Sequence, residues 1–596
     1  MLANTTNDVS AFAAESFDFV VVGGGTAGLA VASRLSEDPN ISVGVLEAGP
    51  DLSDDPNVAS AGGWLVTAYS PSYAWGFETV PQLHAEQKKI NLPRGRLLGG
   101  CSAMNAMMWT RASRPEYNAL AELGNNGWDF ESLLPYFKKA QSHSPQEQDI
   151  LPGTGVLTPH QGERGPVKTS FNTWYSSLIS PFIESLKALS FQINTDPNDG
   201  DLTGLSNIAR AADGEKGTRQ HSGVAYLQSA TPRKNLVVLT NAHATNIVLA
   251  REGASFTARG VEFVVGDVKY TVTAKKEVIL CAGAYGSPQL LELSGIGMPS
   301  ILGKYGIETL VDLPVGENLQ DHLMVSLNFL LTPESQANLK VIPISGDIED
   351  VAGKDAKSTS TGGPFLFSPL RKVVPENNHA RLIELLNEYL SSDDISLMER
   401  AQFSLQKKWL EDPYCTAAEA EVMFANLPGA AGLPLPDGSM SLWLPTAHLH
   451  PASRGYVHIA SSDPLAKPEI DHKYLSRDYD LQALLQIVRF VQKIVKTGAL
   501  GKIVTGSALP PPEVQTDEQL ATWIRGNIAT VFHPVGSTPM APKAIGGVVD
   551  STLKVYGTTN LRVVDAGILP LQLGATPMST VYAIAEKAAD MIKAGI

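Results

Sequence analysis

The stretch FDFVVVGGGTAGLAVASRLSEDPNISVGVLEAGP, residues 17–50, decides how this chain is expected to fold. Residues 17–22 are an apolar run with the length of one buried strand. Residues 29–35 follow the pattern of a helix, and residues 42–46 form a second apolar run. A strand, a helix and a second strand in this order predict a βαβ unit with two parallel strands.

Three glycines between the first strand and the helix point to a ligand for this unit. Gly23, Gly25 and Gly28 form G-x-G-x-x-G. In that motif one glycine allows a tight turn, one lets the backbone approach a pyrophosphate, and one lets the helix pack closely on the sheet. The helix start offers free N–H groups to the phosphates. Glu47 ends the second strand, where an acid accepts hydrogen bonds from an adenosine ribose. The stretch therefore predicts a site for FAD or NAD, and the acid disfavours NADP.

Size and charge narrow the class of protein. The 596 residues exceed one simple core, so two or more domains are expected. The chain is 43% hydrophobic and 18% charged, which is ordinary for a globular protein. Its net charge of −15 repels phosphate backbones and argues against a nucleic-acid partner. Because no apolar run approaches the roughly 18 residues of a membrane span, no membrane partner is expected.

Cysteine usage and the first residues bear on the compartment. Cys101, Cys281 and Cys415 are too few for a disulfide framework, and no residues have metal-ligand spacing, so no metal is expected. Residues 1–16 lack the basic start and apolar segment of a signal peptide. This slightly favours an intracellular protein, although a secreted chain after processing would have the same features. The sequence leaves the oligomeric state open.

Beyond residue 50 the pattern alternates between strands and helices. Strands are expected over 235–250, 258–280, 323–331 and 560–564, and helices over 380–410, 481–497 and 579–592. Residues 342–375 are rich in Gly, Ser and Pro and are expected to form a loop. The α/β pattern at both ends predicts a dinucleotide domain built from distant segments, with a second domain that covers the cofactor.

Several sequence blocks, taken in order, resemble the glucose-methanol-choline (GMC) family of FAD-dependent oxidoreductases, in particular its fungal aryl-alcohol oxidase and glucose dehydrogenase-like members. After the βαβ unit the blocks are PRGRLLGGCSAMNAM (93–107), GTRQHSGVAYL (217–227), GAYGSPQLLELSGIG (283–297), VGENLQDH (315–322), HPVGSTPM (533–540) and NLRVVDAGILP (560–570). The 283–297 block alone is a highly specific signature. The resemblance runs from residue 17 to residue 592.

The resemblance implies a fold and its division into domains. The fold class is α/β (α+β overall), with a Rossmann-like FAD-binding domain of discontinuous segments and a substrate-binding domain with an antiparallel sheet and helices. On this chain the FAD-binding domain would comprise residues 16–168, 218–322 and 528–596. The substrate-binding domain would comprise residues 169–217 and 323–527.

The resemblance also assigns residues to FAD. The adenosine and pyrophosphate would lie against Gly23, Gly25, Gly28 and Glu47. Ala244 would meet the adenine, and Asp565 and Ala566 would lie near the pyrophosphate and the ribityl chain. Gly99, Gly100 and Asn105 would lie along the ribityl chain and the flavin ring, and Pro577 and Met578 at the pyrimidine ring of the flavin. Some relatives bind FAD covalently through a histidine just before the asparagine of the 93–107 block. Met104 stands there in this chain, so FAD is expected to be non-covalent.

His533 is the expected catalytic base. Oxidation of an alcohol by a flavin requires the hydroxyl to lose a proton while the carbinol carbon passes a hydride to flavin N5. A neutral histidine is the usual base, and His533 lies in the family's block for this residue. The second family position, just before Pro577, is usually His or Asn. Here it is Thr576, which can exchange a hydrogen bond but cannot take up a proton near neutral pH.

These residues favour one function and leave rivals open. The favoured function is FAD-dependent oxidation of a small-molecule alcohol to an aldehyde or ketone, with oxygen or a quinone as electron acceptor. The alternative, which Thr576 supports, is a non-redox lyase or cyclase that keeps FAD as a structural part and uses His533 for acid–base chemistry. A third hypothesis is a protein that binds FAD but catalyses no reaction, and the intact sequence block around His533 argues against it. The substrate is not determined.

A few other residues are weaker candidates. His322 is expected to be structural, because it closes a turn under the cofactor domain, and Cys101 is expected to be a small packed residue near the flavin. Trp443, His448 and His450 precede a turn and are candidates for the lining of the substrate pocket.

Overall fold

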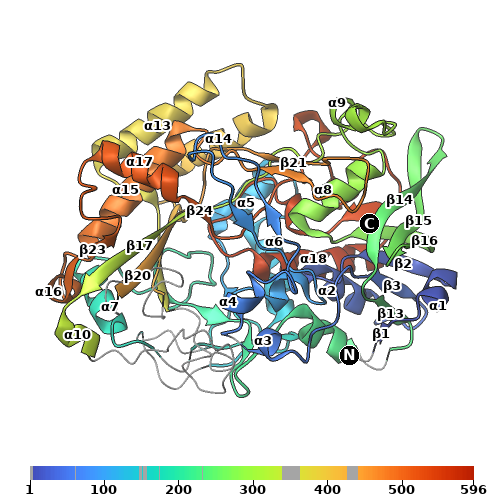
Figure 1. Ribbon diagram of the computed structural model, residues 1–596, viewed down its shortest axis with the longest axis horizontal. Helices are drawn as coiled ribbons and strands as arrows, with labels where there is room; N and C mark the ends of the chain where they lie inside the picture. The colour runs from blue at the N-terminus through green and yellow to red at the C-terminus, as the bar shows by residue number, and fades with distance from the viewer. Residues whose placement is uncertain are drawn as a thin grey trace.

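Two β-sheets organise the molecule, each with its own hydrophobic core. The computed structural model describes residues 4–60, 62–145, 151, 157–172, 175–230, 233–337, 363–425 and 441–595. A largely parallel sheet lies at one end of the molecule, on the right in Figure 1. An antiparallel sheet lies at the other end, beneath the helices at the upper left. The predicted α/β fold class is confirmed.

The predicted βαβ unit forms the centre of the first sheet. It consists of β2 (Ser16–Val22), α2 (Thr26–Leu35) and β3 (Val43–Leu46), and β2 pairs with β3 in parallel. The helix begins three residues before the predicted start, directly after Gly25, which caps it. Gly23 makes the turn into the helix with a φ of +104°, a conformation that a residue with a Cβ adopts only under strain.

Later segments complete the first sheet on both sides of this unit. The strand order is β1 (Thr5–Thr6), β13 (Leu236–Leu239), β3, β2, β16 (Val268–Leu280), β15 (Ser255–Val265) and β14 (His243–Glu252). The long strand β16 pairs with β2 along one edge. Along its other edge it pairs first with β15 and then with β25 (Leu561–Val563). A strand near the carboxy terminus therefore joins the sheet that the amino-terminal unit begins.

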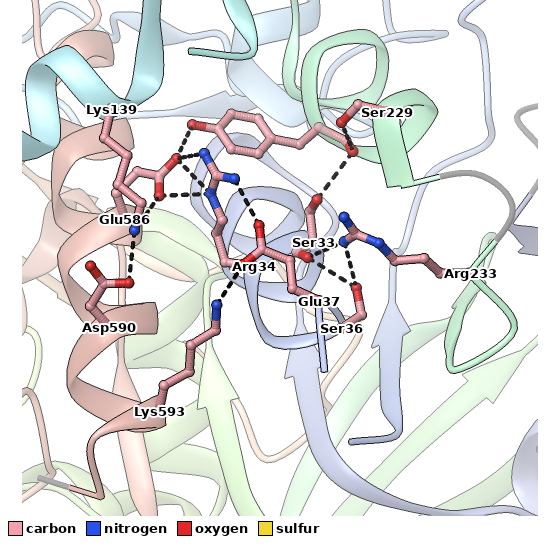
Figure 2. A network of polar contacts seen from close by, with 11 residues as sticks. Ser33, Arg34, Ser36, Glu37, Lys139, Ser229, Arg233, Glu586, Asp590 and Lys593 are labelled. Carbon is pink, nitrogen blue, oxygen red and sulfur yellow. Dashed lines mark hydrogen bonds and ion pairs between the residues drawn. The ribbon is translucent and has the colours of Figure 1, made fainter. Parts of the chain in front are cut away.

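The carboxy-terminal helix α18 (Met578–Lys593) packs against α2 and α6 (Phe130–Ala140). Figure 2 shows the polar network at this contact, centred on Glu586 of α18. The Glu586 carboxylate is fully buried and accepts hydrogen bonds from Arg34 of α2, at 2.8 Å, and from the Tyr226 hydroxyl, also at 2.8 Å. Lys139 of α6 adds an ion pair at 3.3 Å. A buried carboxylate is tolerated here because hydrogen bonds and cations surround it.

The second sheet is antiparallel and carries helices on one face. Its strands, in order, are β23 (Val504–Leu509), β17 (Leu323–Leu331), β20 (Ser441–His448), β19 (Ala420–Met423), β18 (Pro364–Ser368) and β9 (Gly204–Asn207), with β24 (Ala529–Thr530) on β17. Helix α15 (Asp478–Ile494), the predicted amphipathic helix, packs on β17 and β20, and α13 (Glu376–Leu390) packs on α15. The opposite face of the sheet is thereby left to line a cavity.

One element prediction is wrong and one is only coarse. Within the described part of 342–375, where a loop was expected, the apolar residues of β18 form a strand between β19 and β9, and α12 (Leu370–Val373) follows it. Residues 342–362 lie outside the described residues. The predicted helical region 380–410 is two helices, α13 and α14 (Leu397–Glu411). The predicted domain limits remain a prediction. Over the described ranges, no helix is long and apolar enough to cross a bilayer.

Candidate active site

A cavity of about 1050 Å³ lies between the two sheets. Its wall includes Val22 and Leu46, which end β2 and β3, and Cys281, which follows β16. The cavity thus opens at the carboxyl ends of the parallel strands, where open α/β sheets bind their ligands. Its size lies at the upper end of the range for ligand pockets and leaves room for a large cofactor together with a substrate.

Most of the predicted site residues line this cavity. They are Gly23, Gly25, Glu47, Gly100, Asn105, Ala244, His533, Asp565, Ala566, Thr576, Pro577 and Met578. Gly28 and Gly99 are buried and lie behind the wall instead. A methyl group on Gly28 would lie 1.9 Å from Gly23 O, so Gly28 serves the packing of α2 against the turn. The structure therefore brings segments from five regions of the sequence to one cavity.

The glycine loop offers an anion site at the wall. A methyl group on Gly25 would have Gly100 Cα, at 3.8 Å, as its nearest neighbour, so the backbone there faces open cavity. Among the described residues no side chain caps the start of α2. The first N–H groups of the helix are therefore available, and together with the helix dipole they suit a phosphate group.

Glu47 is held by the same loop. Its carboxylate oxygens accept hydrogen bonds from the backbone N–H groups of Gly24, at 2.8 Å, and Gly49, at 2.7 Å. Burial raises the pKa of Glu47 to about 7, and these two N–H groups and Arg96 oppose that rise. A carboxylate oxygen can accept more than one hydrogen bond, so Glu47 keeps acceptor capacity on the cavity side. A contact with a ribose stays a prediction.

Two further contacts join distant sequence blocks beside the cavity. Asn105 Nδ2 donates a hydrogen bond to Met578 Sδ at 3.1 Å, which ties the 93–107 block to the start of α18. Asp565 accepts hydrogen bonds from Gly283 N–H at 2.9 Å and from the Ser287 hydroxyl at 2.6 Å. Both partners of Asp565 lie on α8 (Gly283–Leu293), so the carboxyl fixes the 283–297 block against the carboxy-terminal block.

The residues present fit FAD. The free N–H groups at the glycine loop suit a pyrophosphate, and Glu47 beside them can accept hydrogen bonds from a ribose hydroxyl. Ala244, Asn105 and His533 line the same cavity as this loop, and its volume of about 1050 Å³ leaves room for a large cofactor. Met104 lines the cavity, and its thioether cannot form a histidyl link to the cofactor.

His533 lies in the cavity wall with its backbone held on both sides. Its N–H donates to Asp321 Oδ1 at 3.0 Å, and its carbonyl accepts from Gln572 Nε2 at 2.9 Å. The ring stands perpendicular to that of His322, with the two Nδ1 atoms 3.0 Å apart. Burial and the positive charge of Arg94 lower the pKa of His533 to about 3. The imidazole is therefore neutral at neutral pH and can act as a base.

The hydroxyl group of Thr576 is already engaged. Thr576 Oγ1 lies 3.1 Å from the carbonyl oxygen of Met108, which can only accept, so the hydroxyl proton points there. Thr110 Oγ1, at 2.7 Å, then donates to Thr576 Oγ1 and also accepts from the Thr576 N–H at 2.9 Å. Thr576 keeps one lone pair for a further hydrogen bond but has no proton left to donate.

The second sheet supplies an apolar wall with one acid in it. The residues of this face are Met324, Ser326, Phe365, Glu421, Met423, Trp443 and Pro445. Glu421 lies on β19 and is 2% exposed, and none of the described residues gives its carboxyl group a hydrogen bond. Burial raises the pKa of Glu421 to about 8, so the carboxyl is mainly protonated at neutral pH and can donate a hydrogen bond.

The prediction for the substrate side is right for one residue and wrong for two. Trp443 lines the cavity. His448 and His450 do not, because both are fully buried behind it: His448 Nδ1 contacts Glu419 O at 3.2 Å, and His450 Nε2 pairs with Glu116 at 2.9 Å. Histidines next to a turn look alike in sequence, whereas alternation along β20 decides which side chains face the cavity.

Sequence reasoning missed Glu421 and the contact that His322 makes. The alternation of A-E-V-M in β19 would have placed Glu421 and Met423 on one face, but only a known strand can reveal that face. His322 was expected to be structural, and no sequence spacing indicates that it touches a residue 211 positions away.

Comparison with known proteins agrees with this geometry. Residues 17–324 match the amino-terminal part of GMC oxidoreductases, and residues 451–585 match the carboxy-terminal part. A dehydrogenase of Armillaria gallica is 34% identical over 98% of this chain and 94% of its own length. An FAD-dependent oxidoreductase from Chaetomium thermophilum has a TM-score of 0.87 at 28% identity, covering 97% of this chain and 99% of its own. A fungal aryl-alcohol oxidase has a TM-score of 0.83 at 28% identity with the same coverage.

These matches settle the cofactor and the class of enzyme. The two matched regions together span most of the chain and include the glycine loop, His533 and Met578. The cofactor is FAD, as the donor groups of the cavity already suggested. This chain belongs to the GMC oxidoreductase family and is an FAD-dependent oxidoreductase of CH–OH groups.

Proposed function

We propose that this enzyme oxidises a small, largely apolar primary alcohol to an aldehyde, with His533 as the base. The observation that carries the proposal is the imidazole of His533 in the wall of the cavity that the glycine loop also lines. FAD, when bound, supplies the hydride acceptor and is reoxidised by oxygen or a quinone.

His533 would take the hydroxyl proton of the substrate. As the O–H bond breaks, its proton moves to the imidazole nitrogen that faces the cavity, and the C–H electron pair leaves the carbinol carbon with its hydrogen as hydride. The product is then a carbonyl compound with two hydrogens fewer. The proton of Thr576 is engaged by Met108, so its hydroxyl oxygen would only accept a hydrogen bond, from a polar hydrogen of the substrate other than the one that His533 takes. Deprotonation by a positioned base contributes about 10²–10⁴-fold to such a step.

The wall of the second sheet supports the substrate class. Trp443, Phe365 and Met423 give it apolar and aromatic surface, which favours an aryl or allylic alcohol over a bare sugar. Glu421 adds one protonated carboxyl that can donate a hydrogen bond to a substrate oxygen.

The FAD assignments form part of the same proposal. Gly23, Gly25 and Glu47 would bind the adenosine and pyrophosphate, with Gly28 supporting the loop from behind and Ala244 at the adenine. Gly100 and Asn105 would follow the ribityl chain and the flavin ring, with Gly99 supporting that turn from behind the wall. Asp565 and Ala566 would lie near the pyrophosphate and the ribityl chain, and Pro577 and Met578 at the pyrimidine ring of the flavin. FAD would be non-covalent because Met104 offers no histidyl nitrogen, so acid treatment should release it from the denatured chain.

The test is an anaerobic panel of alcohols mixed with the yellow holoenzyme and followed by the absorbance of oxidised flavin. We expect aryl or allylic primary alcohols to bleach the band, and admitting oxygen or a quinone to restore it. The panel should include a hexose and a secondary alcohol as competitors. Conversion of a substrate without any bleaching would instead establish the non-redox lyase or cyclase, and no conversion at all would overturn both.

A further inference from the structure

We propose that His322 is a positioning residue that sets the proton of His533 on Nδ1 and so keeps Nε2 of the base free for the substrate. This inference deepens the proposed function and rests on it. It starts from an unusual contact, a hydrogen bond between two imidazole rings whose Nδ1 atoms are 3.0 Å apart. Such a contact requires that one nitrogen donate and the other accept.

The direction of this hydrogen bond follows from the far side of His322. His322 Nε2 lies 2.9 Å from the carbonyl oxygen of Leu573. A carbonyl oxygen can only accept, so His322 Nε2 must carry a proton. His322 is fully buried, and burial together with neighbouring histidines lowers its pKa well below the ordinary value, so the ring is neutral. Its Nδ1 therefore has no proton and can only accept.

The proton on the shared contact must then belong to His533. His533 is also neutral, because burial and Arg94 lower its pKa to about 3. A neutral imidazole that carries its proton on Nδ1 has a bare lone pair on Nε2. Among the described residues none forms a hydrogen bond to His533 Nε2, and the ring lies in the cavity wall. The carbonyl of Leu573 thus determines, through His322, which nitrogen of His533 meets the substrate.

The fold holds this relay rigidly. Leu573 lies three residues before Thr576, so the same carboxy-terminal segment supplies the carbonyl and the second cavity residue. Asp321, next to His322, accepts the N–H of His533 at 3.0 Å and the hydroxyl of Tyr474 at 2.8 Å. Both imidazoles are therefore fixed through the backbone as well as through their rings. A catalytic base in the wrong tautomer cannot accept the proton, and in a serine protease that fault alone lowers the rate by about 10⁴-fold.

Two substitutions of His322 separate its two ring nitrogens. In His322→Asn the amide oxygen takes the place of Nδ1 and still accepts from His533, while the donor to Leu573 is lost. In His322→Gln the amide nitrogen takes the place of Nε2 and still donates to Leu573, while the acceptor beside His533 is lost. We expect the first variant to reduce flavin within about fivefold of the wild-type rate, the loss of one neutral hydrogen bond. We expect the second to be slowed by about 10²-fold.

The measurements are the anaerobic rate of flavin reduction by a saturating alcohol, the FAD content and the melting temperature of each holoenzyme. A merely structural role predicts that both variants lose rate in step with stability. Equal rates in the two variants, whether both low or both unchanged, would overturn the proposal.

Neutron diffraction from deuterated crystals of the holoenzyme gives a readout that needs no activity. We expect deuterium on His533 Nδ1 and on His322 Nε2, and deuterium on His533 Nε2 would overturn the proposal even if a variant failed to fold. The two hypotheses also fail differently. If no alcohol reduces the wild-type flavin, the proposed function is wrong, whereas the diffraction result still decides the tautomer.

Discussion

The two ends of the cavity are built in opposite ways. At the nucleotide end, Gly23, Gly25 and Glu47 belong to one short βαβ unit, and the groups offered to a ligand are mostly backbone N–H groups. At the histidine end, His533 and Thr576 come from separate segments, and the groups offered are side chains held by other side chains and by carbonyls.

This difference separates binding from chemistry. Backbone N–H groups at a helix start bind phosphate whatever the neighbouring side chains are, so the nucleotide end needs only its glycines and one acid. The histidine end depends on the tautomer and the hydrogen-bond partners of single rings. Substitutions at one end should therefore change FAD affinity, and substitutions at the other should change the rate with FAD still bound.

The largest expected effect is at the histidine end. His533→Ala should slow anaerobic flavin reduction by about 10²–10⁴-fold, because it removes the proposed base. The FAD content should equal that of wild type, since the glycine loop is untouched. Stopped-flow absorbance measures the rate. His84→Ala, at an exposed histidine, is the matched control and should keep the wild-type rate. An unchanged rate in His533→Ala would show that the base is elsewhere.

The next effect belongs to the nucleotide end. Glu47→Ala removes the acceptor that holds Gly24 and Gly49 and that we assign to the ribose, and a lost charge-assisted hydrogen bond costs about 1.5–3 kcal/mol. We expect FAD affinity to fall by about 10–150-fold, while the fraction of enzyme that remains loaded reduces its flavin at the wild-type rate. Titration of the apoenzyme with FAD, followed by flavin fluorescence, measures this. Unchanged affinity would refute the ribose assignment.

A smaller effect is expected at Thr576. Thr576→Val keeps the shape but removes the hydroxyl, leaving Met108 O and Thr110 without one partner each. The change should slow flavin reduction by tenfold at most, since one neutral hydrogen bond is worth about 0.5–1.5 kcal/mol. A loss of 10³-fold would mean that Thr576 acts directly on the substrate proton.

The smallest expected effect is the pH dependence of the base itself. Protonation removes the base, so activity is lost as pH falls through the pKa of His533, which burial and Arg94 lower to about 3. Glu421 also lines the cavity, and its pKa is raised to about 8, so its own titration would overlap with the measurement. The experiment therefore uses the Glu421→Gln variant, which does not titrate at this position. In that background, at saturating FAD, the rate of flavin reduction should vary by less than about twofold between pH 5 and 8. A rise with a midpoint near pH 6.5 would show an unperturbed histidine.

The same contrast explains what could be predicted from the sequence. The βαβ unit was predicted closely because turn, helix and strand signals there are local, and only the helix start differed, by three residues. Most of the residues assigned to FAD do line one cavity, since their blocks carry glycines and short motifs that can be read in order.

The histidine end could not be predicted to the same depth. The sequence block around His533 predicted its place in the cavity. Its partner His322 is 211 positions away in the sequence, and only the tertiary fold brings the two rings together. The position of Glu421 in the cavity wall could not be predicted, because an acidic residue in a short strand belongs to no sequence motif. His448 was wrongly expected in the cavity for a related reason, since the alternation along β20 turns it to the other face of the sheet. His450 lies two residues beyond β20 and pairs with the buried Glu116 instead.

The strand β25 and the helix α18 have a consequence for the order in which the protein can fold during synthesis. A ribosome adds about 5–20 residues per second, so β2 and β3 emerge on the order of a minute before residues 561–593. Until then the second edge of β16 at residues 278–280 has no partner, α2 lacks its packing helix, and Glu586 is not there to neutralise Arg34. A nascent chain halted before residue 560 would therefore expose a sheet edge that pairs readily with other chains, and its cavity would lack the wall that residues 565–566 and 576–578 supply.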